Sequence, residues 1–337
     1  MNLKPTLKDV AQKAGVSVAT ASRILNARGG YHPDTRARVL QAMQDLGYVV
    51  LHAPEPEPSS KRPILGVVFP KVASMLIQEA LAGLQQAAHQ HGFEILVGHT
   101  DGSLERTLTV LRTFLDLPVK GVVFASEILH REYHDLLQKH QTPVVLLSAI
   151  SFQFPVPFVR CDDRRAAFLA TDFLIRKGHR DIAIIAGARS DPFSSTARVT
   201  GYLDALLHHQ LPVQERHIVY TRGFSFQDGK DGFRLLLERE TAVSAVFACS
   251  DEMAAGVLSV AAEHHMSVPE QLSVMGYDNL PLCQMTHPTL TTVAQPFVEM
   301  GQQAVHLLME CLHNPDGQKG LDLGVHIIER GSVRSLP

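Results

Sequence analysis

The chain has few cysteines, and they follow no ligand pattern. They are widely spaced in 337 residues, and no C-x-x-C pair or Cys/His cluster occurs around Cys161, Cys249, Cys283 and Cys311. Zinc sites need closely spaced ligands, so this spacing argues against such a site. It is typical of reduced, buried thiols.

Segments that direct a protein to or across a membrane are also missing. No basic stretch followed by an apolar core opens the chain, and no apolar run is long enough to span a bilayer. We therefore expect a cytoplasmic protein with no membrane partner.

Sequence motifs of common enzymes are absent as well. The chain contains no G-x-G-x-x-G, no Gly-Lys-Ser/Thr phosphate loop, no G-x-S-x-G and no carboxylates paired at helical metal spacing. We expect no catalytic residues, no cofactor and no metal. A turnover assay on a bound ligand would reveal an enzyme.

The segment from Thr6 to Asn26 predicts two short helices joined by a turn. Thr6 is a good N-cap, and Asp9 follows at the spacing of a capping box. Apolar residues then recur on one helical face, at Leu7, Val10, Ala11 and Ala14. Gly15 allows the chain to turn, and Ser17 can cap the second helix. The pattern predicts a helix-turn-helix, which reads duplex DNA.

Two further patterns complete a small head by Tyr48. The second helix divides into an apolar face of Val16, Ala21, Ile24 and Leu25 and an outward face of Ser17, Val18, Ala19, Ser22, Arg23 and Asn26. A third helix is expected from Pro33 to Leu46, with Gly47 as its stop. It would close the core with Val39, Leu40, Met43 and Leu46.

The charge distribution agrees with a DNA-binding head. Residues 1–52 carry a formal charge of +4, whereas the whole chain carries −3, so the remaining residues carry −7. A basic head on an acidic body suits phosphate contact by the head alone. The alternative is a helical hairpin with ordinary surface charge.

From Ile64 the chain alternates short apolar runs with amphipathic stretches. The first series contains Ile64 to Phe69, Gln78 to His91, Glu94 to Val97, Leu104 to Leu115, Gly121 to Phe124 and Val144 to Leu147. The second contains helices at Ala166 to Lys177, Thr196 to His209, Gln227 to Glu238 and Glu252 to His265, and strands at Ile182 to Ala186, Ala245 to Ala248 and Ser273 to Tyr277. Such alternation predicts two doubly wound lobes with parallel sheets.

The N-terminal segment resembles the lactose/galactose repressor family (LacI/GalR), whose N-termini read T-I-K-D-V-A-x-x-A-G-V-S-x-x-T-V-S-R-x-L-N. Further matches follow in family order at Thr35 to Val39, Leu46 to Tyr48, Lys177 to Ala183, Ser250 to Gly256, Gly276 to Asn279 and Pro288 to Val293. The resemblance covers nearly the whole chain. It implies an all-α helix-turn-helix head followed by an α/β periplasmic-binding-protein-like domain of two doubly wound parallel-sheet lobes.

The resemblance also implies a domain plan. A DNA-binding domain is expected over 1–50, a Pro/Glu-rich linker over 51–62, and an effector-binding and dimerisation domain over 63–337. The first lobe would comprise about 63–160 and 292–320, and the second about 161–290 and 321–337. Three crossovers would lie near Asp162, between Leu280 and Leu290, and near Gly320, and the last helix, Phe297 to Leu312, would return to the first lobe. No leucine-heptad segment precedes Pro337, so we expect a homodimer rather than a tetramer.

For DNA, the resemblance implies contacts from the second helix. Val18 and Ala19 would face base edges and meet thymine methyls, and Arg23 can fork onto guanine. Residues that position the head on the backbone are Ser17, Thr20, Ser22, Asn26, Thr35 and Tyr48. Leu7 belongs to the same predicted DNA-binding set.

For a small-molecule effector, we expect a pocket between the lobes, because ligands bind beyond the carboxyl ends of parallel strands. Ser250 and Asp251 follow one predicted strand and Asp278 another. The resemblance implies that Arg198 and Asp278 bind the effector. A rigid donor fork and a carboxylate suit vicinal hydroxyls of a sugar, or the ribose or base edge of a nucleoside.

Several pocket positions have a second, purely structural explanation. Arg198 and Asp278 could form a salt bridge with each other across the cleft. Phe224, aligned with an aromatic position that lies against the ligand in sugar-responsive relatives, could belong to the core. Asp162 and Gln295 could contact effector or only hold the hinge, and Asp251 could cap the following helix. Relatives carry Asn-Pro-Phe-Phe where this chain has Ser74 to Ile77, which predicts a more apolar first-lobe wall around Ser74.

The linker departs from the family. Relatives have a hinge, Tyr-x-Pro-Asn-x-x-Ala-Arg-x-Leu, that becomes helical on DNA and wedges its Leu into the minor groove, whereas here Leu51, Pro54 and Glu57 replace Asn, Ala and Leu. A proline inside a helix costs about 3 kcal/mol. We therefore expect a stiff spacer from Pro54 to Pro58 and an absent or reduced DNA kink. A permuted-site bending assay that shows a sharp central kink would contradict this. The alternative is Leu51 as a substitute wedge.

The sequence thus predicts a ligand-responsive transcriptional repressor that binds a pseudo-palindromic operator as a dimer. A nucleoside or purine effector is the alternative within this class. A sugar-binding transport protein is more remote, because it requires an export signal and has no use for a DNA-binding head.

Overall fold

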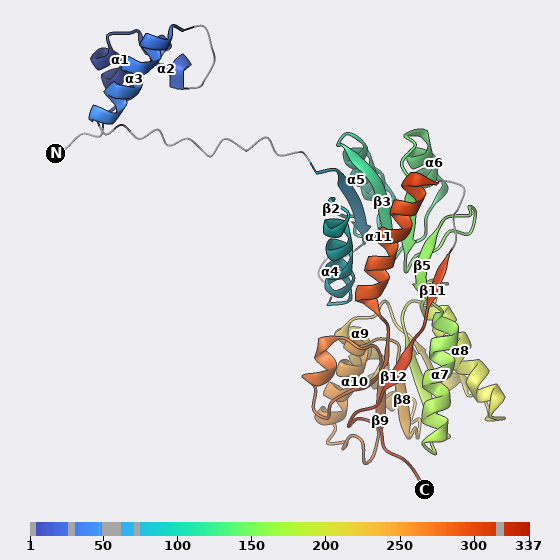
Figure 1. The fold of residues 1–337 in the computed structure, drawn as a ribbon. Coiled ribbons are helices and arrows are strands. Elements are labelled where there is room, and N and C mark those ends of the chain that lie inside the picture. Colours follow the sequence, from blue (N-terminus) through green and yellow to red (C-terminus); the bar gives the residue numbers. More distant parts are fainter. Residues whose placement is uncertain (1–4, 26–30, 47, 49–61, 71–74, 315–319) are drawn as a thin grey trace. The chain divides into compact units, whose positions relative to one another are not determined.

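A computed structural model describes residues 5–25, 31–46, 48, 62–70, 75–314 and 320–337 (Figure 1). The chain forms two compact units, Met1–Lys61 and Arg62–Pro337. Nearly all of the linker predicted over 51–62 lies outside the described residues. Its lack of a hinge helix therefore stays a prediction.

The first unit contains the three predicted helices, α1 (Leu7–Ala14), α2 (Val18–Leu25) and α3 (Pro33–Leu46). The capping box is confirmed: the Asp9 carboxylate accepts from the Thr6 amide at 2.7 Å, and the Thr6 hydroxyl accepts from the Asp9 amide at 3.4 Å. Gly15 makes the turn in the left-handed region, with φ of 63°. Ser17 caps α2 by accepting from the amide of Thr20 at 3.1 Å.

The core of this unit is small and apolar. It is formed by the buried residues Val10, Ala11, Ala14, Ala21, Ile24, Val39 and Ala42. The prediction that Leu40 closes this core is wrong, because its side chain is 43% exposed. Successive helical residues are rotated by about 100°. Val39 and Ala42 therefore share the inner face of α3, and Leu40 points away from it.

The second unit consists of two lobes, each built on a six-stranded sheet. The first sheet has the order β11-β5-β4-β3-β1-β2 and the second β12-β10-β9-β8-β6-β7. The strands of the first sheet are β1 (Ile64–Phe69), β2 (Glu94–His99), β3 (Val119–Ala125), β4 (Val144–Leu147), β5 (Phe158–Cys161) and β11 (Leu321–Leu323). Those of the second are β6 (Ile182–Ala186), β7 (Ile218–Tyr220), β8 (Ala245–Ala248), β9 (Ser273–Asp278), β10 (Thr291–Ala294) and β12 (His326–Ile328). All pairings are parallel except β10 with β12, so the predicted doubly wound architecture is confirmed.

Helices cover the faces of both sheets. In the first lobe, α4 (Met75–Gln90) and α11 (Phe297–His313) contribute to one hydrophobic cluster, and α5 (Leu104–Leu115) and α6 (Arg131–Lys139) to another. In the second lobe, α7 (Asp163–Arg176) packs on α8 (Ser195–His208), and α9 (Phe226–Glu238) packs on α10 (Asp251–Glu263). Figure 1 shows α11, late in the sequence, beside α4, so the last helix returns to the first lobe as predicted.

Glycines allow these helix pairs to approach closely. A Cβ on Gly83 of α4 would lie 1.9 Å from the carbonyl oxygen of Val298, and one on Gly301 of α11 would lie 2.3 Å from that of Ala80. The pair α9 and α10 repeats the arrangement with Gly229 and Gly256. At these crossings backbone meets backbone, and no side chain larger than hydrogen fits.

The lobes are joined by three crossovers, and two of them differ from the prediction. The first lies at Asp162, between β5 and α7, as predicted. The second follows β10, at Gln295 and Pro296, because Thr291–Ala294 pairs with β9 in the second sheet. The third lies between β11 and β12, because Leu321–Leu323 pairs with β5 in the first sheet. Residues 292–294 therefore belong to the second lobe and 321–323 to the first. Both segments contain polar residues, Thr291 and Thr292 in one and Asp322 in the other, so neither has the continuous apolar run that marks a buried strand.

The described part of the chain contains no helix that is both long and apolar enough to cross a membrane. Among the same residues, no group of three or more His, Cys, Asp or Glu side chains is placed to hold a metal ion.

Candidate functional site

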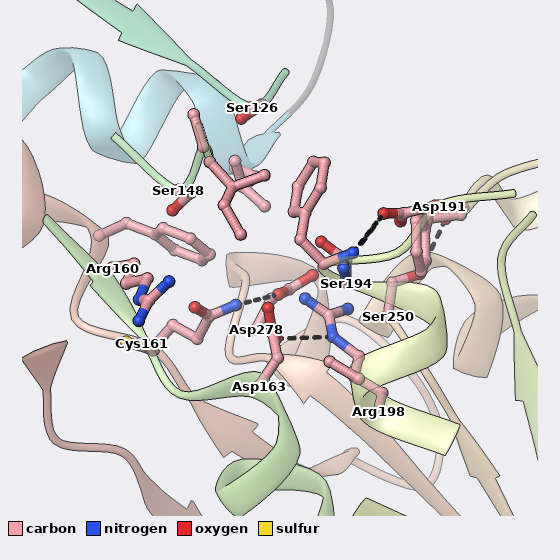
Figure 2. A pocket seen from close by; sticks show the side chains of 18 of the residues that line it. Ser126, Ser148, Arg160, Cys161, Asp163, Asp191, Ser194, Arg198, Ser250 and Asp278 are labelled. Carbon is pink, nitrogen blue, oxygen red and sulfur yellow. Dashed lines mark hydrogen bonds and ion pairs between the residues drawn. The ribbon is translucent and has the colours of Figure 1, made fainter. Parts of the chain in front are cut away.

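A cavity of about 720 Å³ opens where strands of the two lobes end (Figure 2). Its walls include Pro70 after β1, Ser126 after β3, Ser148 after β4 and Asp278 at the end of β9. Small-molecule sites have volumes of about 300–1,000 Å³ and lie at this edge of parallel sheets. The cavity is therefore large enough for a mono- or disaccharide-sized ligand, in the place that the sequence predicts.

Arg198 lies at the centre of the polar wall. It is presented by α8, and it is only 7% exposed. Its Nε donates to Oδ1 of Asp163 at 2.8 Å, its Nη1 donates to the carbonyl oxygen of Cys249, and its guanidinium stacks over the Tyr277 ring at 3.9 Å. Burial opposes the charge, but the carboxylates of Asp163 and Asp278 hold the pKa of Arg198 above its usual range. The side chain is therefore a fixed cation.

Asp278 ends β9 and is also buried, with 4% of its surface exposed. Its Oδ1 accepts from Nε2 of Gln295 at 2.9 Å, and its φ of 117° is rare for a residue with a side chain. Burial raises the pKa of Asp278 well above its usual range, although the charge of Arg198 acts in the opposite direction. The salt bridge of Arg198 is made with Asp163, so the alternative in which Arg198 and Asp278 pair with each other is wrong.

Other predicted pocket residues fall into two groups. Phe224, Ser250, Asp162 and Gln295 line the cavity, together with Arg198 and Asp278. Asp162 also caps α7 by accepting from the amide of Arg165 at 3.0 Å. Ser74 lies outside the described residues.

The prediction that Asp251 binds the effector is wrong, because this residue does not line the cavity. Its Oδ2 accepts from the amide of Leu280 at 2.7 Å and its Oδ1 from the hydroxyl of Thr292 at 2.6 Å, so the fully buried carboxylate holds the loop after β9. The cap of α10 is Ser250, whose hydroxyl accepts from the amide of Met253 at 3.0 Å. Side chains of adjacent residues point in different directions, which explains why Ser250 reaches the cavity and Asp251 does not.

The predicted DNA-binding residues of the first unit differ in exposure, and Leu7 and Tyr48 pack against its core. Ser17, Val18, Ala19 and Arg23 are exposed, and Leu7, Thr20, Ser22, Thr35 and Tyr48 are half-buried. Asn26 lies outside the described residues. Val18 is 46% exposed at the start of α2, where the side chain has no role in the core. An exposed valine there suits contact with thymine methyls, and base contact by this set remains a prediction.

The comparisons with known proteins agree with the two kinds of domain. Residues 6–50 match the model of bacterial regulatory proteins of the lacI family, and residues 171–333 match a periplasmic binding protein-like domain. Catabolite control protein A of Priestia megaterium is 33% identical over 308 residues, which cover 91% of this chain and 92% of that protein. The HTH-type transcriptional repressor CytR of Escherichia coli is 33% identical over 341 residues, covering 98% and 97%. The chain belongs to the LacI family.

A solved structure of a transcriptional regulator with a bound ligand extends the match. The transcriptional regulator CelR in complex with cellobiose superimposes with a TM-score of 0.72 and 29% identity, over 97% of this chain and 99% of that one. The relatives are transcriptional regulators and not enzymes. This LacI-family protein is accordingly a DNA-binding transcriptional regulator.

Sequence reasoning missed several cavity residues of this LacI-family regulator. Asp163 follows the predicted Asp162 directly and is the actual partner of Arg198, while Tyr277 donates its hydroxyl to Oδ1 of Asp163 at 2.7 Å. Ser126 and Ser148 line the first-lobe side with φ of 59° and 47°. The Asp162-Asp163 doublet was a usable signal for Asp163. Serine is common in loops, so nothing in the sequence distinguishes Ser126 or Ser148.

The buried Asp251 makes the stability of this regulator depend on pH. Burial raises the pKa of Asp251 from 3.8 to about 6, although hydrogen bonds from Thr292 and Leu280 favour its charged form. As the pH rises, the unfolded chain therefore loses this proton first, and the free energy of unfolding falls between about pH 4 and pH 6. In an Asp251→Asn variant, the free energy of unfolding in urea should change less with pH in this window than it does in the parent. An unchanged slope would contradict the role given to Asp251.

Proposed function

We propose that this LacI-family protein is a cytoplasmic, dimeric repressor whose affinity for its operator is set by a sugar or sugar derivative bound between the two lobes. The proposal rests on one observation above all: Arg198 and Asp278, a fixed cation and a buried carboxylate, face the same cavity at the carboxyl ends of the strands. A donor fork beside an acceptor fits vicinal hydroxyls. The likeness to CelR bound to cellobiose supports the ligand class.

Through the crossovers, a ligand in the cavity can affect DNA binding by the head. Asp162 and Gln295 line the cavity and lie at two of the three connections between the lobes. A ligand that contacts both lobes changes their relative orientation at these connections, and in a dimer such a change alters the separation of the two heads. The sign of the response follows from which lobe orientation the operator-bound dimer prefers.

A nucleoside effector is the second candidate. The rings of Phe193 and Phe224 both line the cavity, and an aromatic base can stack on such faces. Arg198 and Asp278 would then bind the ribose hydroxyls. The two candidates differ in whether the aromatic side chains meet a base or the apolar face of a sugar ring.

The test combines DNA selection with a ligand panel. Purified full-length protein selects duplexes from a random library, and the best duplex is then titrated in the presence of sugars, sugar acids and nucleosides at moderate salt. We expect a pseudo-palindromic site and a change of its affinity with a sugar. If no duplex competes above the non-specific level, the repressor function is wrong. If only nucleosides act, the second candidate replaces the first.

Arg23 provides a test of the predicted DNA-binding face. An Arg23→Ala variant is expected to lose about 1–3 kcal/mol of binding to the selected operator and to discriminate less at one base pair of each half-site. Arg38→Ala is the matched control, because it removes the same charge from an exposed position on α3 outside the predicted set. Equal losses for the two variants in a gel-shift titration would show that Arg23 contributes only charge.

A further inference from the structure

We infer that the cavity selects an uncharged glycoside, with its hydroxylated ring against the second lobe and an apolar or aromatic group against the first. This inference rests on the proposed function of the cleft and adds the charge and polarity of the ligand. It comes from the ion pairs around the cavity and from the composition of its two walls.

Every arginine in the described lining already has a carboxylate partner. Arg198 is paired with Asp163 as described. Nε of Arg160 lies 2.9 Å from Oδ1 of Asp322, and its guanidinium also stacks on the Phe158 ring at 4.2 Å. The described lining contains no lysine or histidine.

The third arginine, Arg164, is paired in the same way. Its Nε and Nη2 donate to the two carboxylate oxygens of Asp204, at 2.6 and 3.1 Å. Such a two-point pair fixes the guanidinium plane. A phosphate or carboxylate on the ligand would have to compete with Asp204 for this guanidinium.

Acidic side chains outnumber these arginines. The described lining contains five, namely Asp162, Asp163, Asp191, Asp278 and Glu252. The carboxylate of Asp191 accepts from the backbone amides of Phe193, Ser194 and Ser195 at 3.1 to 3.2 Å. The raised pKa of Asp278 disfavours its charged form, but the four other acidic side chains still outnumber the three paired arginines. Like charges at close range disfavour an anionic ligand, and this repulsion is a means of rejecting it.

The first-lobe wall has a different character. Apolar lining residues of this lobe are Pro70, Leu76, Ile77, Ala149, Ile150 and Phe297. Besides the paired Arg160, the hydrogen-bonding side chains among the described lining residues ahead of the first crossover are the hydroxyls of Ser126 and Ser148 and the buried thiol of Cys161. Figure 2 shows these two serines on the side opposite Asp163, Arg198 and Asp278. One end of the ligand thus meets charged groups and the other meets mostly hydrocarbon.

An uncharged glycoside matches the polar wall of the second lobe and the apolar wall of the first. The ring hydroxyls can bond with Arg198, Asp278 and Gln295, while an alkyl, aryl or base substituent displaces water from the first-lobe wall. Sugar phosphates, sugar acids and nucleotides would bring a charge to a cavity whose described cations are all paired. O-glycosides and nucleosides share the required chemistry, and the experiment separates them.

The test uses ligands in matched pairs that differ only in charge. Full-length protein is titrated calorimetrically with an aryl glycoside and its 6-phosphate, with a free hexose and its uronic acid, and with a nucleoside and its 5′-monophosphate. We expect each neutral member to bind at least about tenfold more tightly than its anionic partner, a difference of about 1.4 kcal/mol, and the glycoside to bind more tightly than the free hexose. Anionic members that bind as tightly as neutral ones would overturn the inference. If neither the sugar series nor the nucleoside series binds, the proposed function fails and this inference with it.

A variant that gains affinity for an anionic ligand tests whether the pairing of Arg164 sets the selectivity. Asp204→Asn releases the guanidinium of Arg164 without changing side-chain volume, so this variant should gain about tenfold in affinity for the phosphorylated glycoside and keep its affinity for the neutral one. Glu263→Gln is the matched control, because it removes a carboxylate from an ion pair with Lys230 and Arg234 outside the cavity lining. If the Asp204 variant binds the phosphorylated glycoside no better than the control does, pairing of the arginines does not set the selectivity.

Discussion

An Arg198→Ala variant is expected to bind its operator normally and to lose its response to the effector. The substitution removes a buried cation that contacts Asp163, the Cys249 carbonyl and the Tyr277 ring, at the centre of the cavity. We expect the affinity for the effector to fall about 100-fold or more, which corresponds to about 3 kcal/mol. Calorimetry with the ligand identified from the panel measures this loss, and a gel shift without ligand measures operator binding.

The controls separate loss of contact from loss of fold. Removing one partner of a buried ion pair costs about 3–5 kcal/mol of stability, whereas replacing both partners is often neutral. A double variant, Arg198→Met with Asp163→Asn, should therefore unfold near the temperature of the parent and still ignore the effector. Arg234→Ala, at an exposed ion pair on α9, should respond as the parent does. An effector response in the double variant would contradict the site.

A Gly83→Ala variant is expected to lose about 3 kcal/mol of stability in the first lobe, as overpacking of a tight core does. The added methyl group would lie 1.9 Å from the carbonyl oxygen of Val298, which is backbone and cannot rotate away. The helices α4 and α11 must then separate. Alanine gains about 1 kcal/mol of helix propensity over glycine, which offsets only part of the cost. Urea unfolding followed by circular dichroism measures the change.

Gly324→Ala is the control for this substitution, because its added methyl group meets no atom within 4 Å. It should change the unfolding free energy by less than about 0.5 kcal/mol, as surface substitutions do. Equal unfolding midpoints for the two variants would show that α4 and α11 can move apart freely, and that their close approach contributes little to the lobe.

How much of the fold the sequence predicts depends on how continuous the apolar pattern of each element is. The bounds of β1, β4, β6 and β8 match the predicted apolar runs, because a strand buried on both faces is continuously hydrophobic. The run Thr291–Ala294 is short and half polar, so its place in the second sheet could not be recognised. The second crossover was placed wrongly for that reason. The third was placed wrongly because Leu321–Leu323, which is interrupted by Asp322, could not be recognised as a strand of the first sheet.

The ends of the predicted strands indicate where the cavity lies. Which of the residues there line it depends on the direction of each side chain. Arg198 and Asp278 were found because the resemblance marked them and because ligands gather at the carboxyl ends of strands. Asp163 was not predicted, and Asp251 was wrongly placed in the cavity. Each stands next to a predicted residue that lines the cavity, but its side chain has different partners. Local sequence does not encode that Asp163 meets an arginine 35 positions further on.

The backbone conformation at Asp278 also affects the thermal stability of the protein. The φ of 117° at Asp278 and the φ of 62° at Asn279 are held by neighbours: Arg330 donates to Oδ1 of Asn279 at 2.8 Å, and Asp251 accepts from the amide of Leu280. Such backbone conformations cost roughly 1–3 kcal/mol each. The surrounding chain thus holds the Asp278 carboxyl group in the cavity, and the strained backbone lowers the stability of the protein. Substitutions that relax this turn should raise the melting temperature and make the protein unresponsive, so a screen for heat tolerance alone would select against signalling.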